Sequence, residues 1–133
     1  MTIHVVHVED DKPLKEILKA AFETADPEIN LKQFVNGDQA LPYITEYGRT
    51  VDLFILDIRL TGSMSGIQLA QKIRDLGFPG NIVLTSAYLR PSRDQLTALR
   101  CEYYPKPWHI YDITPKLQQY KLDHDDDDSA NTQ

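Results

Sequence analysis

The chain has 133 residues, of which 41% are hydrophobic and 26% charged, and it contains a single cysteine, Cys101. This size and composition are typical of one globular domain whose core needs no disulfide framework, and one cysteine excludes such a framework within the chain. The longest apolar runs are four residues, far below the about 20 needed to cross a bilayer, and the N-terminus lacks the pattern of a signal peptide. We therefore expect a soluble, cytoplasmic protein that does not bind membranes.

The net charge of -6 is concentrated at the C-terminal end. Residues 123–133 contain five aspartates and no lysine or arginine, whereas the 15 acids and 14 bases of residues 1–122 nearly balance. A run of like charges without apolar residues cannot form a core, so we predict a folded domain over 1–122 and a disordered acidic tail over 123–133. Neither part has the clustered lysines and arginines that a nucleic acid selects, so we expect no nucleic-acid partner.

Short apolar runs alternate along the chain with segments of helical period, which is typical of βα units around a parallel sheet. Three runs have no polar alternation and read as strands buried on both faces, whereas residues 29–35 alternate like an edge strand. The last strand has the weakest pattern. We predict a doubly wound α/β fold with five helices and with strands over 3–8, 29–35, 53–56, 82–84 and 101–104.

The helices are predicted from apolar spacing and from glycine and proline. The first has apolar residues at 14, 17, 18, 21 and 22 and Pro13 in its first turn. Either Pro42 lies in the first turn of the second helix or that helix starts late. Pro115 is expected to kink the fifth helix or to delay its start. The third helix is predicted over about 67–76, with Leu69, Ala70, Ile73 and Leu76 facing inward and Gly77 as its stop, and the fourth from Pro91, carrying Leu96 and Leu99.

A polar or charged residue stands after each buried strand. These residues are Glu9, Asp10 and Asp11, then Asp57, Thr85 and Lys106. In a doubly wound sheet, ligands bind outside the carboxyl ends of the strands, so these side chains are expected to converge. Carboxylates gathered in one crevice favour Mg²⁺, and a lysine and a hydroxyl beside them can hold a phosphoryl group that one carboxylate attacks.

Four motifs, in order and each at a strand end, resemble the receiver domain of two-component response regulators. They are residues 5–11 (VVHVEDD), 52–57 (DLFILD), 82–87 (IVLTSA) and 103–108 (YYPKPW), and the resemblance extends over residues 3 to about 120. It implies a flavodoxin-like sheet with strand order 2-1-3-4-5. It also implies a phosphorylated switch in two-component signalling or a phosphorelay rather than a multiple-turnover enzyme.

The resemblance assigns a role to each motif. Asp57 is similar to the phosphoacceptor, Glu9 and Asp10 to the acidic pair that holds Mg²⁺ with Asp57, and the backbone carbonyl of Arg59 to the main-chain metal ligand. The remaining matches are Thr85 with the switch hydroxyl, Tyr103 with the aromatic switch residue, and Lys106 with the phosphoryl-contacting lysine, whose bond to Pro107 is cis in this family. Asp11 is expected to cap the first helix, and His4 and His7 to be structural rather than zinc ligands.

Three departures from the family pattern bear on the switch. In the loop after the acceptor, Thr61 replaces the usual proline and one residue is inserted; the stretch before Lys106 lacks the usual Gly-Ala; and Pro115 interrupts the fifth helix. They concern the lifetime of the phosphorylated state and the signalling face rather than the fold.

The expected partners are a sensor histidine kinase or histidine phosphotransfer protein, and a downstream protein target or a second copy of the chain. No output domain follows in this sequence, so protein contact is the expected output. It would involve the fourth helix, fifth strand and fifth helix, including Tyr88, Arg90, Arg93 and Arg100. The alternative is a receiver-like interaction or dimerisation module that needs no phosphate. A phosphatase is disfavoured because position 59 is arginine where that chemistry requires a second aspartate.

Overall fold

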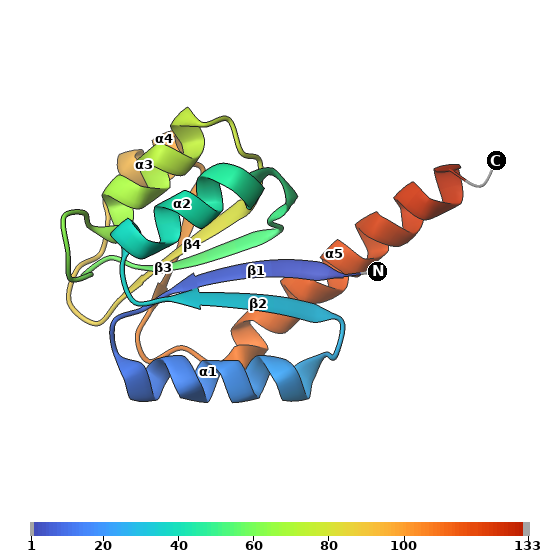
Figure 1. Cartoon of the computed structure of the whole chain (residues 1–133), viewed down its shortest axis with the longest axis horizontal. Helices are drawn as coiled ribbons and strands as arrows, with labels where there is room; N and C mark the ends of the chain where they lie inside the picture. The colour runs from blue at the N-terminus through green and yellow to red at the C-terminus, as the bar shows by residue number, and fades with distance from the viewer. Residues whose placement is uncertain (1, 132–133) are drawn as a thin grey trace.

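Five parallel strands pair side by side in the order β2-β1-β3-β4-β5, as predicted (Figure 1). The computed structural model describes residues 2–131, without the side chains of residues 110, 111 and 124–131. The strands are β1 (Ile3–Val8), β2 (Ile29–Phe34), β3 (Leu53–Asp57), β4 (Asn81–Ser86) and β5 (Cys101–Pro105). The predicted strand limits lie within two residues of these, and β2 is an edge strand as its alternation indicates.

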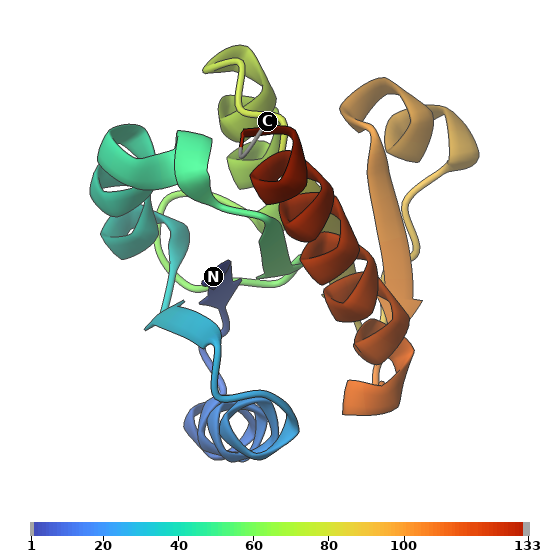
Figure 2. The ribbon, with the colours of Figure 1, turned by 90° about the vertical axis from the view of Figure 1, so that its right-hand side faces the viewer.

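Helices cover both faces of the sheet. Figures 1 and 2 show α1 and α5 on one face and α2, α3 and α4 on the other. The helices are α1 (Lys12–Ala25), α2 (Gly37–Tyr47), α3 (Gly66–Asp75), α4 (Arg93–Leu99) and α5 (Ile110–Asn131), with a short 3-10 turn η1 (Gly48–Thr50) after α2. This is the doubly wound arrangement in which the carboxyl ends of the strands form one edge.

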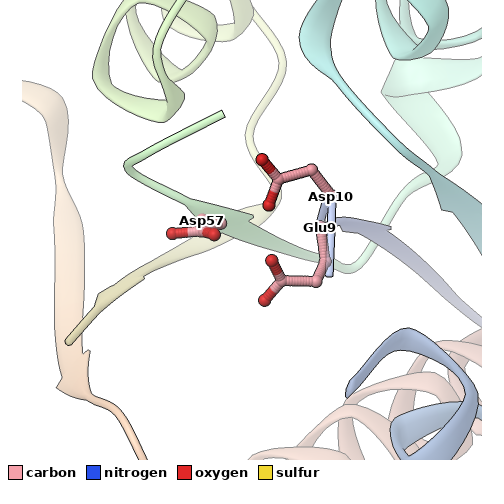
Figure 3. Close-up of side chains that lie close together, drawn as sticks. All are labelled: Glu9, Asp10 and Asp57. Carbon is pink, nitrogen blue, oxygen red and sulfur yellow. The ribbon is translucent and has the colours of Figure 1, made fainter. Parts of the chain in front are cut away.

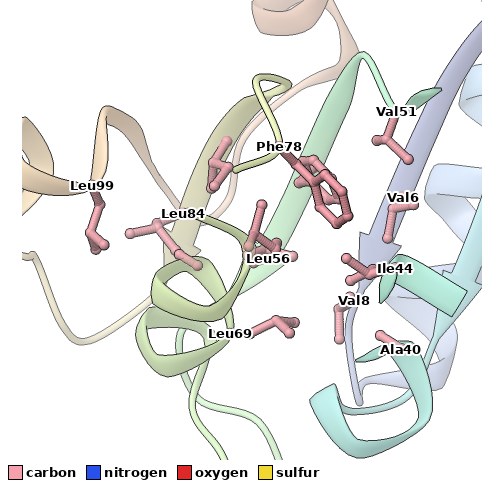
Figure 4. Close-up of a cluster of buried hydrophobic side chains, with 14 of the residues drawn as sticks. Val6, Val8, Ala40, Ile44, Val51, Leu56, Leu69, Phe78, Leu84 and Leu99 are labelled. Carbon is pink, nitrogen blue, oxygen red and sulfur yellow. The ribbon is translucent and has the colours of Figure 1, made fainter. Parts of the chain in front are cut away.

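The core has two layers because successive side chains of a strand point to opposite faces. Val6 and Val8 of β1 lie in the layer beneath α2, α3 and α4 (Figure 4), whereas Ile3 and Val5 pack toward α1 and α5. The side chains of β3 are all buried. This explains why the apolar runs of the central strands show no polar alternation.

Side-chain caps fix where four helices begin. Asp11 accepts a hydrogen bond from the Leu14 amide and caps α1, as expected, and Asn36, Ser65 and Ser92 cap α2, α3 and α4. As a result α4 begins two residues after the predicted start at Pro91. The stop at Gly77 is confirmed by its φ of 80°.

Two residues predicted to face inward are exposed instead. Ile17 is 64% exposed and Leu76 is 40% exposed. Both lie at the margin of an apolar stripe whose centre is buried, at Leu18 and Phe22 in α1 and at Leu69 and Ile73 in α3. The apolar periodicity therefore identified the buried face of each helix correctly. It predicted a wider buried stripe than the structure has.

The prediction for Pro42 was wrong, and Pro115 does not delay the start of α5; that Pro115 kinks the helix stays a prediction. Pro42 lies inside α2 and Pro115 inside α5, beyond the first turn of each helix. Both residues are exposed. The carbonyl that loses its amide partner at each proline can therefore be hydrated, which lowers the cost of keeping proline in a helix.

The backbone of α5 continues as a helix to Asn131, through most of the segment predicted to be a disordered tail. The helix shows no break at the predicted domain boundary at residue 122. The last two residues of that tail, and its side chains from residue 124 onward, lie outside the described residues. Within residues 2–131 no helix is long and apolar enough to cross a membrane.

Candidate functional site at the carboxyl ends of the strands

Three carboxylates meet where β1 and β3 end. Glu9 and Asp10 follow β1, and Asp57 is the last residue of the neighbouring strand β3. One oxygen of each lies within 4.8 Å of the others (Figure 3). Asp11 is used instead as the cap of α1. The structure thus brings together the three side-chain metal ligands that the sequence predicts, in a spacing that a Mg²⁺ ion with oxygen ligands fits.

Lys106 reaches this cluster from the end of β5. Its ammonium nitrogen lies 2.6 Å from Glu9 Oε1 and 3.1 Å from Asp57 Oδ2. The Lys106 amide donates to the carbonyl of Ser86, and the Lys106–Pro107 bond is cis, as the resemblance implies. The lysine therefore bridges two of the three carboxylates from a fixed backbone position.

Protonation equilibria in the cluster are shifted by crowding. Burial, together with a hydrogen bond and the charge of Asp57, raises the pKa of Glu9 to about 7 against the opposing effect of Lys106. For Lys106, burial alone would lower the pKa, but the bonds to Glu9 and Asp57 outweigh it and raise the pKa. One lysine does not fully neutralise three carboxylates, so the cluster has the charge to hold a cation.

Thr85 lies beside the acceptor and has an unsatisfied hydroxyl. Its backbone is in register with Asp57 across β3 and β4, and the residue is 1% exposed. Among the described residues, Thr85 Oγ1 is the one buried side-chain nitrogen or oxygen without a hydrogen-bond partner. Most buried polar atoms in native proteins have a hydrogen-bond partner, so this one is notable. A hydroxyl in this position is free to donate to a group placed on Asp57.

Tyr103, the predicted switch residue, is linked to the strand that carries Thr85. Its hydroxyl donates to the Ser86 carbonyl at 3.0 Å, and the Arg90 guanidinium lies 5.5 Å from its ring centroid. Tyr103 packs toward the α2, α3 and α4 layer, whereas Tyr104 packs toward α1 and α5. The Ser86 carbonyl therefore accepts from both Tyr103 and Lys106, a connection that sequence patterns did not indicate.

A cavity of about 390 Å³ opens over the cluster. The Arg59 amide donates to Asp57 Oδ1 at 3.2 Å and orients the acceptor carboxylate. Ser86 and Tyr88 line the cavity although the sequence analysis placed neither in the site. They lie one and three residues after Thr85, and that proximity was the available signal. The lining residues are Glu9, Asp10, Asp11, Asp57, Arg59, Ser86, Ala87, Tyr88 and Lys106.

The inserted loop after Asp57 is pinned to the start of α2. Asp38 accepts hydrogen bonds from both the amide and the hydroxyl of Ser63. At the far end of the loop Gly66 opens α3, and a Cβ there would collide with the main-chain oxygen of Asp57. The insertion is thus accommodated by a defined contact, and α3 still approaches the acceptor closely.

The histidines of β1 are structural, as expected. His7 is buried, and its Nδ1 lies 3.1 Å from the side-chain nitrogen Nε2 of Gln33. Burial, together with the charges of Lys106 and Lys15, lowers the pKa of His7 to about 3. His4 pairs in the same way with Asn30. Within the described residues, the group of side chains that could hold a metal contains neither histidine.

Several solved structures share this fold. A CheY-like receiver domain from Methylobacillus flagellatus is 23% identical, covers 90% of this chain and 98% of its own length, and gives a TM-score of 0.74. The receiver domain of a LuxO-type repressor from Vibrio parahaemolyticus is 20% identical over 98% of both chains, with a TM-score of 0.76. The unphosphorylated HemR receiver domain of Leptospira biflexa is 24% identical over 89% of this chain and 93% of its own, with a TM-score of 0.74.

No curated protein matches the sequence. Residues 5–117 match the family described as the response regulator receiver domain, which is most of the chain and contains all four motifs. Proteins of this family act in two-component signalling, interact with histidine kinases or phosphotransfer proteins and with effectors, and typically bind Mg²⁺ at an acidic pocket. The chain belongs to the response regulator receiver domain family.

Proposed function

We propose that this protein is a phosphorylation-controlled switch in which Asp57 accepts a phosphoryl group from a phosphohistidine on a sensor kinase or phosphotransfer protein. The observation that carries the proposal is one cavity lined by three carboxylates and a bridging lysine, with the unpaired hydroxyl of Thr85 on the adjacent strand in register with Asp57. Together these residues offer a nucleophile, charge neutralisation and a hydrogen-bond donor, which are the requirements for holding a phosphoryl group. We expect this reaction in the cytoplasm.

In the transfer, an oxygen of Asp57 attacks the phosphorus and forms a P–O bond as the P–N bond of the donor breaks. The electron pair of that bond stays on the imidazole nitrogen, which leaves as part of a histidine. A Mg²⁺ ion held by Glu9, Asp10, Asp57 and the Arg59 carbonyl would neutralise phosphoryl oxygens and the cluster's excess charge. Lys106 stays near Asp57 Oδ2, where it pairs with a second phosphoryl oxygen.

The added charge would then change the surface beyond the site. When the Thr85 hydroxyl donates to the phosphoryl group, β4 shifts at the residue before Ser86, whose carbonyl holds the Tyr103 hydroxyl. Tyr103 then moves with it, and the surface of α4, β5 and α5 binds its partner differently. Arg90, which stacks on Tyr103, and Arg93 and Arg100 of the same face are the side chains we expect a downstream protein or a second copy to contact.

Intact-mass measurement after incubation with acetyl phosphate and Mg²⁺ tests the acceptor. Wild type should gain one phosphoryl group, Asp57→Asn should gain none, and Asp75→Asn, which removes an exposed carboxylate of α3, should behave as wild type. No gain by wild type, even with a phosphorylated kinase as donor, would overturn the proposal. We also expect no multiple turnover on small phosphomonoesters, because position 59 is arginine where phosphatase chemistry requires a second aspartate.

The second candidate function is a phosphate-independent interaction module. The observation in its favour is the pair of exposed apolar side chains on the loop after β4, Tyr88 at 79% and Leu89 at 52% exposed. Partner binding that survives Asp57→Asn unchanged would select this alternative, whereas binding that requires the modified wild type would reject it.

A further inference from the structure

A groove of about 580 Å³ runs between α1 and the edge strand β2. Ile29 and Leu31 of β2 line it, and both are half-buried against the core layer beneath α1 and α5. Because β2 pairs with β1 on one side only, its other side and the groove beside it lie open (Figure 1). The groove is at the opposite end of the sheet from β5, so it is separate from the surface we assign to signalling.

Three lysines line this groove. Lys15 and Lys19 lie one turn apart on α1, and Lys32 lies on β2. Within the part of the chain that the structure describes, none of the three forms an ion pair. Glu16 and Glu23 also line the groove and reduce its excess of positive charge to one. The groove thus offers three unpaired ammonium groups beside an apolar floor, which suits an acidic ligand.

The same chain has an acidic segment at the end of α5. Residues 123–128 contain five aspartates and one histidine, and the backbone stays helical through them to Asn131. Aspartate is a poor helix former, and negative charge is unfavourable at the C-terminal end of a helix. A helix of this sequence therefore gains stability when a partner supplies positive charge.

The direction of α5 prevents this segment from reaching the groove of its own chain. Figure 1 shows the end of α5 extending past the amino-terminal edge of the sheet and away from α1. One end of the groove, at Glu23 and Ile29, lies at that same edge. Residues 123–131 span about 13 Å as a helix, and residues 29–33 of the groove span about 16 Å. Two copies that face each other with these edges can therefore each place an acidic helix end in the other's groove.

We propose that two copies of this chain pair by exchanging the acidic ends of α5, each of which binds the groove between α1 and β2 of the other copy. A lysine on an edge strand disfavours the addition of another strand, so Lys32 favours a helix in this place. The contacts are few and exposed, so pairing needs protein at about 100 µM and weakens with salt. It involves neither Asp57 nor α4 and is independent of the proposed phosphorylation.

Sedimentation of the full chain without Mg²⁺ or phosphoryl donor tests the pairing. Wild type should form a reversible dimer at about 50 mM salt that is mostly lost at about 500 mM, and deletion of residues 123–133 should abolish it. Lys19→Glu and Lys32→Glu should each weaken the dimer by about tenfold, because each variant reverses a charge in two identical contacts. Lys72→Glu, the same change on the exposed side of α3, and Asp57→Asn should dimerise as wild type does.

Cross-linking identifies which groups meet. A carbodiimide joins a carboxylate to an amine where the two are in contact, and a mixture of unlabelled and isotopically labelled chains distinguishes links between copies from links within one. We expect residues 123–128 of one copy to be joined to Lys15, Lys19 or Lys32 of the other.

Three results would overturn the pairing. They are a monomer under all these conditions, a dimer that survives the deletion or appears only after phosphorylation, and links between copies that avoid the groove lysines. Labelling of Asp57 by acetyl phosphate would still uphold the proposed function in each case. A chain that pairs through the groove but never labels would overturn the proposed function alone.

Discussion

At the amino-terminal edge of the sheet, Arg74 donates four hydrogen bonds to the main-chain carbonyls of Leu99, Phe78, Gly80 and Arg100. At the carboxyl-terminal edge, three carboxylates share one lysine and the Thr85 hydroxyl has no partner. The first edge ties the end of α3 to the start of β4 and to the turn between α4 and β5. The second edge leaves carboxylate charge incompletely neutralised and the Thr85 hydroxyl without a hydrogen-bond partner.

Other contacts extend this contrast. At the amino edge, Asn81 donates to the Tyr120 hydroxyl and Lys121 pairs with Asp26, which joins α5 to the turn before β2. We infer that the two edges have different roles. The amino edge, where the polar groups are paired, stabilises the fold. The carboxyl edge, where they are not fully paired, is less stable and is available to bind a ligand. Variants at the two edges should therefore shift the free energy of unfolding in opposite directions.

The largest expected effect comes from the amino edge. Arg74→Ala should lower the free energy of unfolding by about 4 kcal/mol, because it removes a charged donor from four carbonyls of which several are shielded from water. Urea unfolding in Mg²⁺-free buffer measures this. Lys72→Ala, an exposed residue of the same helix, should change stability by less than about 0.5 kcal/mol. A similarly small loss for Arg74→Ala would break the comparison.

The second effect is on how the free energy of unfolding depends on pH. The contribution of Glu9, at the carboxyl edge, falls as pH rises, whereas that of Asp26, at the amino edge, falls as pH drops. The raised Glu9 pKa of about 7 means that the folded protein holds this proton more tightly than the unfolded chain. Its contribution to stability is complete below the ordinary pKa and is lost as pH rises through about 7. Between about pH 5 and 8, Glu9→Gln should gain about 2 kcal/mol relative to wild type.

Asp26 provides the contrasting variant. Its hydrogen bond to Lys121 lowers its pKa, so its contribution is present above the ordinary value and is lost only as pH falls below it. The cost of Asp26→Asn should therefore stay constant over the range in which Glu9→Gln changes. A Glu9→Gln profile parallel to wild type in Mg²⁺-free urea titrations would contradict this account of the cluster.

The third expected effect is a smaller change in stability that distinguishes Asp10 from Asp11. Asp10→Asn removes one of three repelling carboxylates and should stabilise the Mg²⁺-free protein by about 1 kcal/mol, while reducing the stabilisation that added Mg²⁺ gives to wild type. Asp11→Asn, at the cap of α1, should have almost no effect, because asparagine caps a helix as well as aspartate does. Equal responses of the two variants in thermal unfolding would argue against a shared cluster.

The smallest effect is expected from the acidic end of the chain. Deleting residues 123–133 should leave phosphoryl labelling intact, because among the described side chains no contact of the site involves this segment. It removes charge that is unfavourable near a helix C-terminus, so we expect no loss of stability. Intact mass and thermal unfolding of the truncated protein check this, and impaired labelling would show that the tail contributes to the site.

The sequence predicted the carboxyl edge better than the amino edge, for a physical reason. Glu9 and Asp57 directly follow apolar runs, so the strand and the residue at its end are read from the same local pattern. This pattern, with the motif at Lys106, predicted that Glu9, Asp10, Asp57 and Lys106 converge, and the structure brings the four side chains together. The Arg74 contacts join residues up to 26 positions apart through backbone carbonyls, which have no sequence signature.

Features that depend on solvent exposure were also beyond local reasoning. Nothing in the pattern around Pro42 or Pro115 indicates that these residues face water, where a helix tolerates proline. The stacking of Arg59 on Tyr88 likewise requires two loops whose distance is set by strand pairing. The roles of Thr85 and Tyr103 as switch residues stay predictions, supported by an unpaired hydroxyl and by the shared contact at Ser86.

The most direct test of the contrast between the two edges is backbone amide NMR of the protein before and after addition of Mg²⁺ and beryllofluoride, which mimics a phosphoryl group on a carboxylate. We predict large shifts for the amides of Thr85, Ser86, Tyr88, Tyr103 and Lys106, and unchanged signals for Phe78, Gly80 and residues 99–101 around Arg74. Comparable shifts at both edges, or none at the carboxyl edge, would contradict the account.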